Sequence, residues 1–307
     1  MPVPPENPPT AETIALGRDL FHDKRLSADQ SISCASCHEA ASFFADPRRF
    51  SQGVDKKEGN RNAPPVMNAA FHPVQFWDGR AATLEEQAGG PIANPVEMNL
   101  PHDQAVARVA ADGNYRARFE QAFGPGPVTM DKITKAIASF ERTLIAGDTP
   151  FDRYFYGGDK TALSPEAIRG LALFRDKQRG NCATCHTIEE RHALFTDGRF
   201  HNVGAGLSNE GELVDQGRFA VTKREADRGA FRTPTLRNIA RTAPYMHDGS
   251  LRTLRQVVDF YIGGGSSNPH LDPEIKPLRL KGEERGELVA FLEALSSPAP
   301  RQPEGKP

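Results

Sequence analysis

Two short motifs in this chain combine cysteine and histidine at a spacing that can hold an iron porphyrin. Each reads CxxCH, and the two are Cys34-Ala35-Ser36-Cys37-His38 and Cys182-Ala183-Thr184-Cys185-His186. In such a motif both cysteines bond the porphyrin edge, and the adjacent histidine ligates the iron from the same face. We therefore predict two covalently bound haem c groups, with His38 and His186 as the proximal iron ligands.

The rest of the cysteine usage supports this prediction. All four cysteines of the chain lie within the two motifs, so none is left for a disulfide or a catalytic thiol. Zinc is the alternative for paired CxxC groups, but a four-cysteine zinc site does not need a histidine directly after each pair. The pattern therefore favours haem and a compartment outside the cytoplasm.

Charge and hydropathy exclude two kinds of partner. The formal net charge is -2 and the basic residues are scattered among acidic ones, so nucleic acid is not an expected partner. No apolar run approaches the roughly 20 residues that a membrane helix needs. Residues 1–10 are rich in proline and polar groups and do not read as a secretory signal. We expect a periplasmic protein whose leader has been removed.

The segments around the two motifs resemble each other, which indicates a duplicated module. GxxLFxDK precedes each motif, at residues 17–24 and 170–177, and FxDxR follows each, at residues 44–48 and 195–199. A chain of 307 residues is long enough for two cores. We expect a mainly α fold of two cytochrome c-like domains with long loops, residues 1–155 and 156–307, the best boundary signal being residues 149–161.

Six segments show apolar residues at the three-to-four spacing of an amphipathic helix, whereas strand signals are weak. The predicted helices are residues 11–26, 104–123, 130–145, 166–174, 251–262 and 283–295. Thr10 is a candidate N-cap of the first helix, and Ser164 followed by Pro165 is a candidate start of the fourth. Both of these helices deliver the chain to a CxxCH motif.

Further motifs resemble those of the bacterial dihaem cytochrome c peroxidases. They are NAPPVMNAAF at residues 62–71, QFWDGR at 75–80, Pro91, VEMN at 96–99, FRTPTLRN at 231–238 and APYMHDG at 243–249. The resemblance extends over roughly residues 11–295, with both CxxCH motifs in order. It implies that the N-terminal haem reacts with hydrogen peroxide and that the C-terminal haem transfers electrons.

The first departure from the ordinary peroxidase pattern concerns the N-terminal haem. Those enzymes have a histidine that caps this haem at rest, but residues 50–60 contain none, and Val54 or its neighbours take its place. His72 is the alternative ligand in this domain, although the following Pro73 suits a loop turn instead. The resemblance therefore implies an open first iron.

The second departure concerns the C-terminal haem. Ordinary members have a methionine 14 residues after the histidine of PYxHxG, whereas this chain has Tyr261 at that distance from His247. Tyrosine at this place is similar to the MauG branch of the family. A phenolate ligand stabilises ferric or higher iron and so would lower the reduction potential. Met246 is the competing ligand, and a core position on the 251–262 helix is the other interpretation of Tyr261.

The resemblance also assigns catalytic roles. Glu97 would transfer the proton during peroxide cleavage, Gln87 would hold the peroxide, and Pro91 would line the distal pocket. Trp77, the one tryptophan of the chain, would relay charge between the haems. Without the resemblance, glutamate and glutamine are mostly solvated surface residues, and tryptophan is usually a packing residue.

A calcium ion between the haems is the last cofactor that the resemblance implies. Its ligands would be Asn68 and the backbone carbonyls of Arg232 and Pro234, because calcium prefers oxygen ligands of this kind. The alternative is a structural turn without a metal.

Three functions are compatible with these residues. In the first, MauG-like function, hydrogen peroxide forms a high-valent state shared by the two haems, which oxidises a protein or another external substrate at long range. The second is a cytochrome c peroxidase that reduces hydrogen peroxide to water with electrons from a small redox protein, a cytochrome c or a cupredoxin. The third, a non-catalytic dihaem electron carrier or sensor, is disfavoured by Glu97 in the matched motif.

Overall fold

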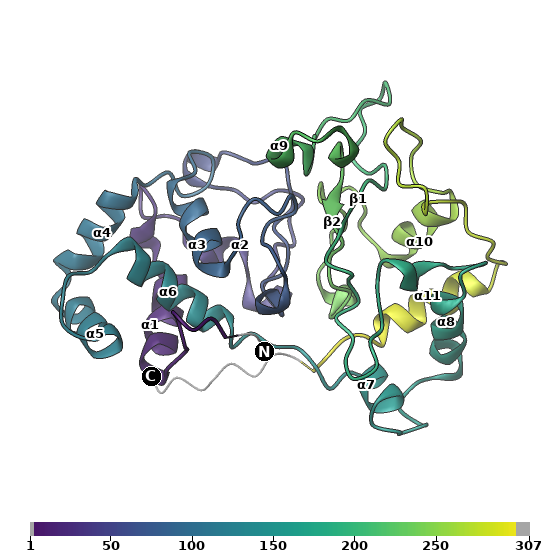
Figure 1. Cartoon of the computed structure of the whole chain (residues 1–307), viewed down its shortest axis with the longest axis horizontal. Coiled ribbons are helices and arrows are strands. Elements are labelled where there is room, and N and C mark those ends of the chain that lie inside the picture. The colour runs from purple at the N-terminus through teal and green to yellow at the C-terminus, as the bar shows by residue number, and fades with distance from the viewer. Residues whose placement is uncertain (1–2, 299–307) are drawn as a thin grey trace. The chain divides into compact units, whose positions relative to one another are not determined.

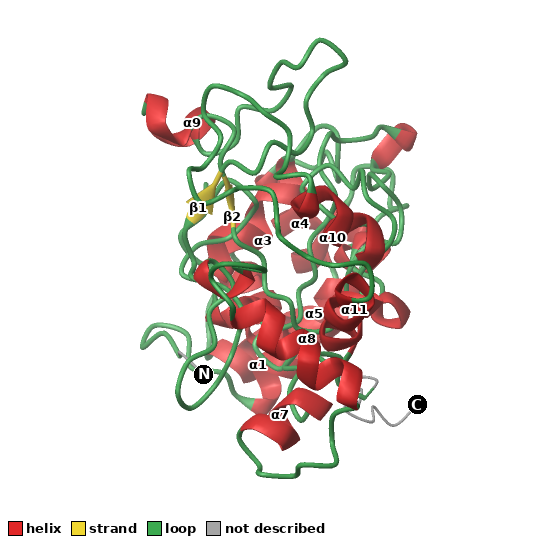
Figure 2. Cartoon of the chain, turned by 90° about the vertical axis from the view of Figure 1, so that its right-hand side faces the viewer, coloured by secondary structure: helices red, strands yellow, loops and turns green. Residues whose placement is uncertain are grey.

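The computed structural model describes residues 3–298, so the outermost ends of both predicted domains lie outside the described residues. The described chain is mainly helical, with long loops and little strand (Figures 1 and 2). It divides into two compact units. Unit 1 consists of the chain up to Phe76 together with Arg80–Ile145, and unit 2 consists of Trp77–Gly79 and the chain from Ala146 onward.

The α-helices of unit 1 are mostly of two to three turns. They are α1 (Ala11–His22), α2 (Cys34–Cys37), α3 (Leu84–Ala93), α4 (His102–Ala111), α5 (Gly113–Phe123) and α6 (Met130–Glu141). Short 3₁₀ turns lie at Lys24–Leu26, Ala40–Ser42, Val54–Lys56 and Ala69–Phe71. The first CxxCH motif therefore lies on its own short helix, α2.

Unit 2 is helical as well and contains a minimal sheet. Its helices are α7 (Pro150–Phe155), α8 (Pro165–Arg175), α9 (Phe219–Thr222), α10 (Leu254–Ile262) and α11 (Glu284–Glu293). Strands β1 (Phe200–His201) and β2 (Phe231–Arg232) pair antiparallel, with Phe200 opposite Arg232. Further 3₁₀ turns lie at Cys182–Thr184, Glu225–Asp227 and Ile239–Arg241. Among the described residues, no helix combines the length and apolar character that a membrane span requires.

The glycine of GxxLFxDK allows one close helix contact in each unit. A Cβ atom on Gly17 of α1 would lie 1.8 Å from the carbonyl oxygen of Ala136 on α6. A Cβ atom on Gly170 of α8 would lie 2.0 Å from the carbonyl oxygen of Glu287 on α11. Only glycine permits such an approach. The leucine and phenylalanine of the motif are buried in both units, so the repeat encodes the same helix pairing twice.

The aspartate of the same motif ends the helix. Oδ1 of Asp23 accepts the N–H of Arg25, and Oδ1 of Asp176 accepts the N–H of Gln178, each at 2.9 Å. A side chain bonded to the backbone two residues ahead favours a turn over another helical residue. The predicted 11–26 helix therefore stops at His22 and continues as a 3₁₀ turn.

Three other helices differ from the prediction. The predicted 104–123 helix is broken into α4 and α5 at Asp112, whose side chain accepts the N–H groups of Asn114 and Tyr115 as the N-cap of α5. Helix α3 was not predicted, because the tract Gly89-Gly90-Pro91 inside it is typical of a loop. The helix around residues 130–145 ends earlier, at Glu141.

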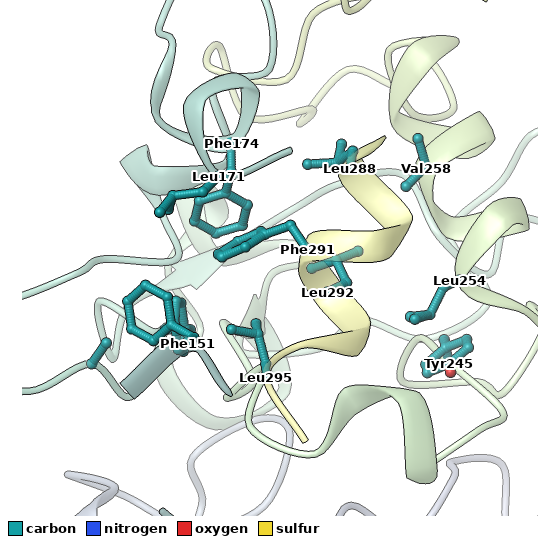
Figure 3. Close-up of a cluster of buried hydrophobic side chains, with 12 residues drawn as sticks. Phe151, Leu171, Phe174, Tyr245, Leu254, Val258, Leu288, Phe291, Leu292 and Leu295 are labelled. Atoms are coloured by element: carbon teal, nitrogen blue, oxygen red, sulfur yellow. The ribbon is translucent and has the colours of Figure 1, made fainter. Parts of the chain in front are cut away.

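The core of unit 2 is built on aromatic side chains (Figure 3). Phe291 of α11 packs 5.0 Å from the ring of Phe174 on α8 and 5.9 Å from the ring of Phe151 on α7. Phe195, which follows the second CxxCH motif, completes the cluster. Because Phe151 belongs to this core, the division between the units falls after Ile145, ahead of the predicted boundary after residue 155.

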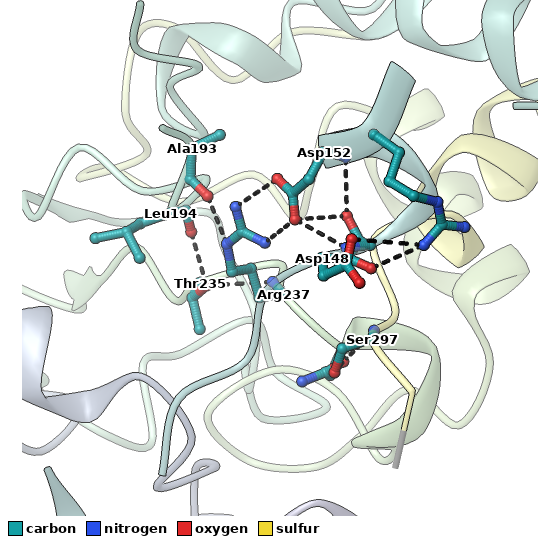
Figure 4. A network of polar contacts seen from close by, with 10 residues as sticks. Asp148, Asp152, Ala193, Leu194, Thr235, Arg237 and Ser297 are labelled. Carbon is teal, nitrogen blue, oxygen red and sulfur yellow. Dashed lines mark hydrogen bonds and ion pairs between the residues drawn. The ribbon is translucent and has the colours of Figure 1, made fainter. Parts of the chain in front are cut away.

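A buried ion pair connects three segments of unit 2 (Figure 4). The guanidinium of Arg237 donates to both carboxylate oxygens of Asp152, at 2.8 and 2.9 Å, and its Nε donates to the carbonyl of Ala193 at 2.6 Å. Asp152 also accepts the N–H of Thr149 and so caps α7. This pair ties the FRTPTLRN tract to α7 and to the loop after the second CxxCH motif.

Candidate functional site

Both CxxCH histidines are oriented by a backbone carbonyl. Nδ1 of His38 lies 3.2 Å from the carbonyl oxygen of Phe44, and Nδ1 of His186 lies 2.7 Å from that of Phe195. A carbonyl only accepts, so Nδ1 carries the proton and Nε2 keeps its lone pair. Burial lowers the pKa of both rings, which favours the neutral form. Each histidine therefore presents Nε2 in the form that an iron needs.

The cysteines of both motifs are free thiols and partly buried. Burial raises the pKa of Cys182 to about 12, with Cys185 nearby adding to the effect, and burial likewise raises the pKa of Cys34. The sulfurs of Cys34 and Cys182 are therefore protonated at neutral pH, and none of the four sulfurs is used by a disulfide, so all are available for thioether attachment of a porphyrin.

Two buried polar groups fit an additional bound group. The guanidinium of Arg232 is 4% exposed, and its Nε has no hydrogen-bond partner. Burial lowers the pKa of Arg232 to about 10, and no carboxylate opposes that effect. A buried cation without a counter-ion is costly, so the site suits an anionic group such as a haem propionate. Oε2 of Glu97 is likewise buried without a hydrogen-bond partner.

The structure reveals that the internal repeat is longer than the sequence motifs suggest. Residues 64–91 and 234–261 share a series of local conformations at a constant offset of 170 residues. The matched pairs are Asn68 with Asn238 and Gly79 with Gly249, all at positive φ, the bridges Gln75 to Ala81 and Tyr245 to Leu251, and the N-caps Thr83 and Thr253. Helices α3 and α10 are therefore equivalent elements of the two units.

This equivalence places two site residues at the same position. Pro91 on α3 and Tyr261 on α10 each lie eight residues after the capping threonine. Proline has no side-chain donor atom, whereas tyrosine offers a phenol oxygen. The two units therefore differ in whether this position can supply a ligand.

Tyr261 lies in the electrostatic field of the second CxxCH motif. Burial raises the pKa of its phenol, and the charges of Cys182 and Cys185 add to this shift. The competing Met246 has a left-handed φ of 70°, matching Phe76 at 65° in unit 1. In unit 1, Phe76 approaches Gly90, the residue before Pro91.

The predicted distal residues of the first haem come from α3 and the turn that follows it. Gln87 and Pro91 are four residues apart, so they share one face of α3. The N–H of Met98 donates to the carbonyl of Pro91 at 3.1 Å, and the N–H of Glu97 donates to that of Asn94 at 3.0 Å. The chain thus folds Glu97 back onto the end of the helix that carries the other two residues.

Glu97 is held by the loop in which ordinary dihaem peroxidases have the capping histidine. The N–H of Val54 donates to the carbonyl of Glu97 at 2.8 Å, and a Cβ atom on Gly53 would lie 2.4 Å from that oxygen. Burial raises the pKa of the Glu97 carboxyl, while the charge of Arg80 and a hydrogen bond with Asn94 oppose the shift. A carboxyl of this kind can hold and return a proton near neutral pH.

The remaining predicted residues are distributed over both units. Trp77 is buried and belongs to unit 2, where its carbonyl accepts the N–H of Arg232 at 2.8 Å. Asn68 is buried in unit 1, whereas Arg232 and Pro234 lie in unit 2. The relay through Trp77 and the calcium site stay predictions.

One buried carboxyl was not among the predicted residues. Glu141 ends α6, is 4% exposed, and its Oε2 has no hydrogen-bond partner. Burial raises its pKa to about 8, and its charge in turn raises the pKa of Cys34, so it lies near the first CxxCH motif. Its sequence context is that of any polar residue at a helix end, so no sequence pattern distinguishes it.

Known proteins with the same arrangement identify the family. A family profile described as Di-haem cytochrome c peroxidase matches residues 11–161. The methylamine utilization protein MauG of Methylorubrum extorquens is 42% identical over 298 residues, which cover 97% of this chain and 82% of the relative. The chain belongs to the dihaem cytochrome c peroxidase family. The predicted resemblance is confirmed, and so are the two covalently bound haem c groups that this family implies.

Other relatives support the same conclusion. The cytochrome c peroxidase Ccp of Escherichia coli is 40% identical over 300 residues, covering 96% of this chain and 60% of the relative. A solved structure of a MauG-like protein associated with microbial copper homeostasis matches with a TM-score of 0.85 at 35% identity, covering 97% of this chain and 93% of that one. The mainly helical cytochrome c-like fold is therefore confirmed, and this dihaem peroxidase is an oxidoreductase.

Proposed function

We propose that this dihaem peroxidase is a MauG-like oxidase. Hydrogen peroxide would react at the haem held by Cys34, Cys37 and His38, and the oxidising equivalents would be shared with the haem held by Cys182, Cys185 and His186. A protein or another external substrate would then be oxidised at long range. The periplasm is the proposed location, since covalent haem indicates an oxidising compartment.

One observation carries this proposal. Equivalent helices present Pro91 in unit 1 and Tyr261 in unit 2, so this position would supply no ligand to the first haem and a phenol ligand to the second. An open iron can bind peroxide, whereas an iron with a phenolate ligand is favoured in its oxidised forms. The two haems are thereby suited to different tasks.

The bound haems supply an iron that accepts peroxide and one-electron redox chemistry. The side chains of this protein would hold the iron, orient the peroxide and transfer its proton. Nε2 of His38 and of His186 would bind iron because their Nδ1 atoms are engaged by carbonyls. Glu97 would take the first proton of the peroxide and return it to the leaving oxygen, and Gln87 on the same side of α3 would orient the peroxide. Trp77 would relay charge, and calcium on Asn68, Arg232 and Pro234 would stabilise this region.

Addition of one equivalent of hydrogen peroxide to the fully ferric protein tests the proposal. We expect loss of both ferric signals in electron paramagnetic resonance, together with a near-infrared charge-resonance band. No reaction until one haem has been reduced would refute it. In Tyr261→His the shared oxidised state should be lost, whereas Tyr245→Phe removes a phenol of unit 2 that only bonds the Ile239 carbonyl and should leave it intact.

A cytochrome c peroxidase is the second candidate, because relatives with that name match at similar identity to the MauG proteins. It would take electrons from a cytochrome c or a cupredoxin and reduce hydrogen peroxide to water. Steady turnover with either reduced donor, without formation of the shared oxidised state, would favour this function over the first.

A further inference from the structure

The aspartate of the FxDxR repeat lies together with a cation near the second cysteine of each CxxCH motif. In unit 1, Arg48 donates to both oxygens of the fully buried Asp46, at 2.8 and 2.9 Å, and to the carbonyl of Ser36 inside the motif at 2.7 Å. Both charges act on Cys37. The pair is neutral as a whole, since a guanidinium keeps its charge at any working pH.

Unit 2 uses a different cation at the equivalent place. Asp197 lies 2.9 Å from Nε2 of His201, and Nδ1 of His201 lies 2.6 Å from Oδ2 of Asp272. The sulfur of Cys185, a carboxylate oxygen of Asp197 and a ring nitrogen of His201 all lie within 4.8 Å of one another. We call Asp197, His201 and Asp272 the His201 cluster. Where unit 1 has one acid and one base, unit 2 has two acids and one base.

Counting protons fixes the charge of this cluster. A neutral imidazole has one N–H, yet both ring nitrogens of His201 face carboxylate oxygens, which accept only. The ring is therefore an imidazolium, and with two carboxylates the cluster carries a net charge of minus one. The hydrogen bond to Asp197 is the main reason that the pKa of His201 rises to about 11. Against the effect of burial, the bond from His201 lowers the pKa of Asp197 to about 2.

The cluster also joins two segments that enclose the second motif. Asp197 and His201 follow Phe195, whose carbonyl orients His186. Asp272 lies on the segment that follows Tyr261, and its N–H donates to the carbonyl of Asn202 at 2.9 Å. The charged groups of the His201 cluster therefore cannot move away from Cys185 without breaking the ion pairs of His201 with Asp197 and Asp272.

We propose that His201 is a positioning residue that holds Asp197 and Asp272 as a net negative cluster at the thioether edge of the second haem, and that this cluster lowers the reduction potential of that haem. A nearby negative charge stabilises the oxidised form, because oxidation adds positive charge to the iron. The neutral Asp46 and Arg48 pair has no such effect on the first haem. The inference rests on haem attachment at Cys185 and holds for either candidate function.

Spectroelectrochemical titration of the haem-loaded protein tests the proposal, with the two haems followed separately by their electron paramagnetic resonance signals. One unit charge about 10 Å away at an effective dielectric of about 20 changes an equilibrium constant by roughly tenfold. Asp272→Asn should therefore favour reduction of the second haem by about tenfold, or ~59 mV for a one-electron couple. Asp272→Glu should restore the wild-type potential.

Three comparisons separate this charge effect from a structural one. Glu210→Gln removes an exposed carboxylate from the same unit and should shift neither potential. His201→Gln removes the cation and should lower the potential of the second haem or leave it unchanged. An unchanged potential in Asp272→Asn, an equal shift in Asp272→Glu, or a rise in both Asp272→Asn and His201→Gln would overturn the proposal.

Discussion

Glu141 provides a direct test of how burial sets charge in unit 1. The carboxyl ends α6, where the helix dipole disfavours a negative charge, and its Oε2 has no hydrogen-bond donor. The neighbouring guanidinium of Arg142 is already occupied by both oxygens of Glu85, at 2.7 and 3.1 Å. Burial therefore dominates and raises the pKa of Glu141 from 4.5 to about 8.

The sign of the effect on stability follows from proton binding. Between pH 4.5 and about 8 the folded state keeps the Glu141 proton, whereas the unfolded state has released it. The folded state then binds more protons, so the free energy of unfolding falls as the pH rises through this window and levels off above it. From pH 5 to pH 7 the loss amounts to roughly 2–3 kcal/mol.

Glu141→Gln should remove this pH dependence, because the amide does not ionise. We expect the stability of the variant relative to wild type to rise by roughly 2–3 kcal/mol between pH 5 and pH 7. Urea unfolding of the ferric protein at a series of pH values, followed by circular dichroism, measures this difference. Glu120→Gln, at an exposed position of α5, is the control and should show no such trend. A constant difference at all pH values would refute the reasoning, since packing changes alone are independent of pH.

Three other substitutions probe packing, pairing and catalysis. Gly17→Ala should destabilise unit 1 by ~1–3 kcal/mol in urea unfolding, whereas Gly59→Ala, which meets no atom within 4 Å, should be nearly neutral. Arg237→Met leaves the Asp152 carboxylate without its partner and should cost ~3–5 kcal/mol at pH 7. That cost should shrink as the pH falls through the lowered pKa of Asp152, as acid titration of the unfolding free energy would show. Glu97→Gln should slow the reaction with peroxide by ~10²–10⁴-fold in stopped-flow absorbance, with unchanged ferric spectra.

The parts of this fold that the sequence predicts are those that depend on local patterns. Amphipathic spacing located the helices that pair in each core, whereas the close contact at the glycine of GxxLFxDK became apparent only in the folded chain. Helix ends were less predictable, because Asp23 and Asp112 act through single side-chain bonds that a periodic pattern does not contain. Helix α3 was hidden by Gly90 and Pro91, which stay helical because the surrounding chain holds them.

The candidate site also has features that the sequence shows and features that only the folded chain shows. The CxxCH motifs are explicit in the sequence, and so is the absence of a histidine from residues 50–60. Burial is not explicit, and it is burial that distinguishes Glu97 and Glu141 from the many solvated glutamates of the chain. The second acid of the His201 cluster, Asp272, lies 71 residues from His201, so only the folded chain reveals it.

The extended repeat explains how two similar modules come to have unlike haem environments. Residues 64–91 and 234–261 keep the same turns and the same threonine cap, although few side chains are identical. Among the pairs that differ are Pro91 and Tyr261, and Trp77 and His247, which we propose to lie beside the haems. The side chains at these positions therefore differ between the units, although the backbone conformation is the same. Because the two units share a backbone but carry different side chains at equivalent positions, one haem iron can remain open while the other has a sixth ligand.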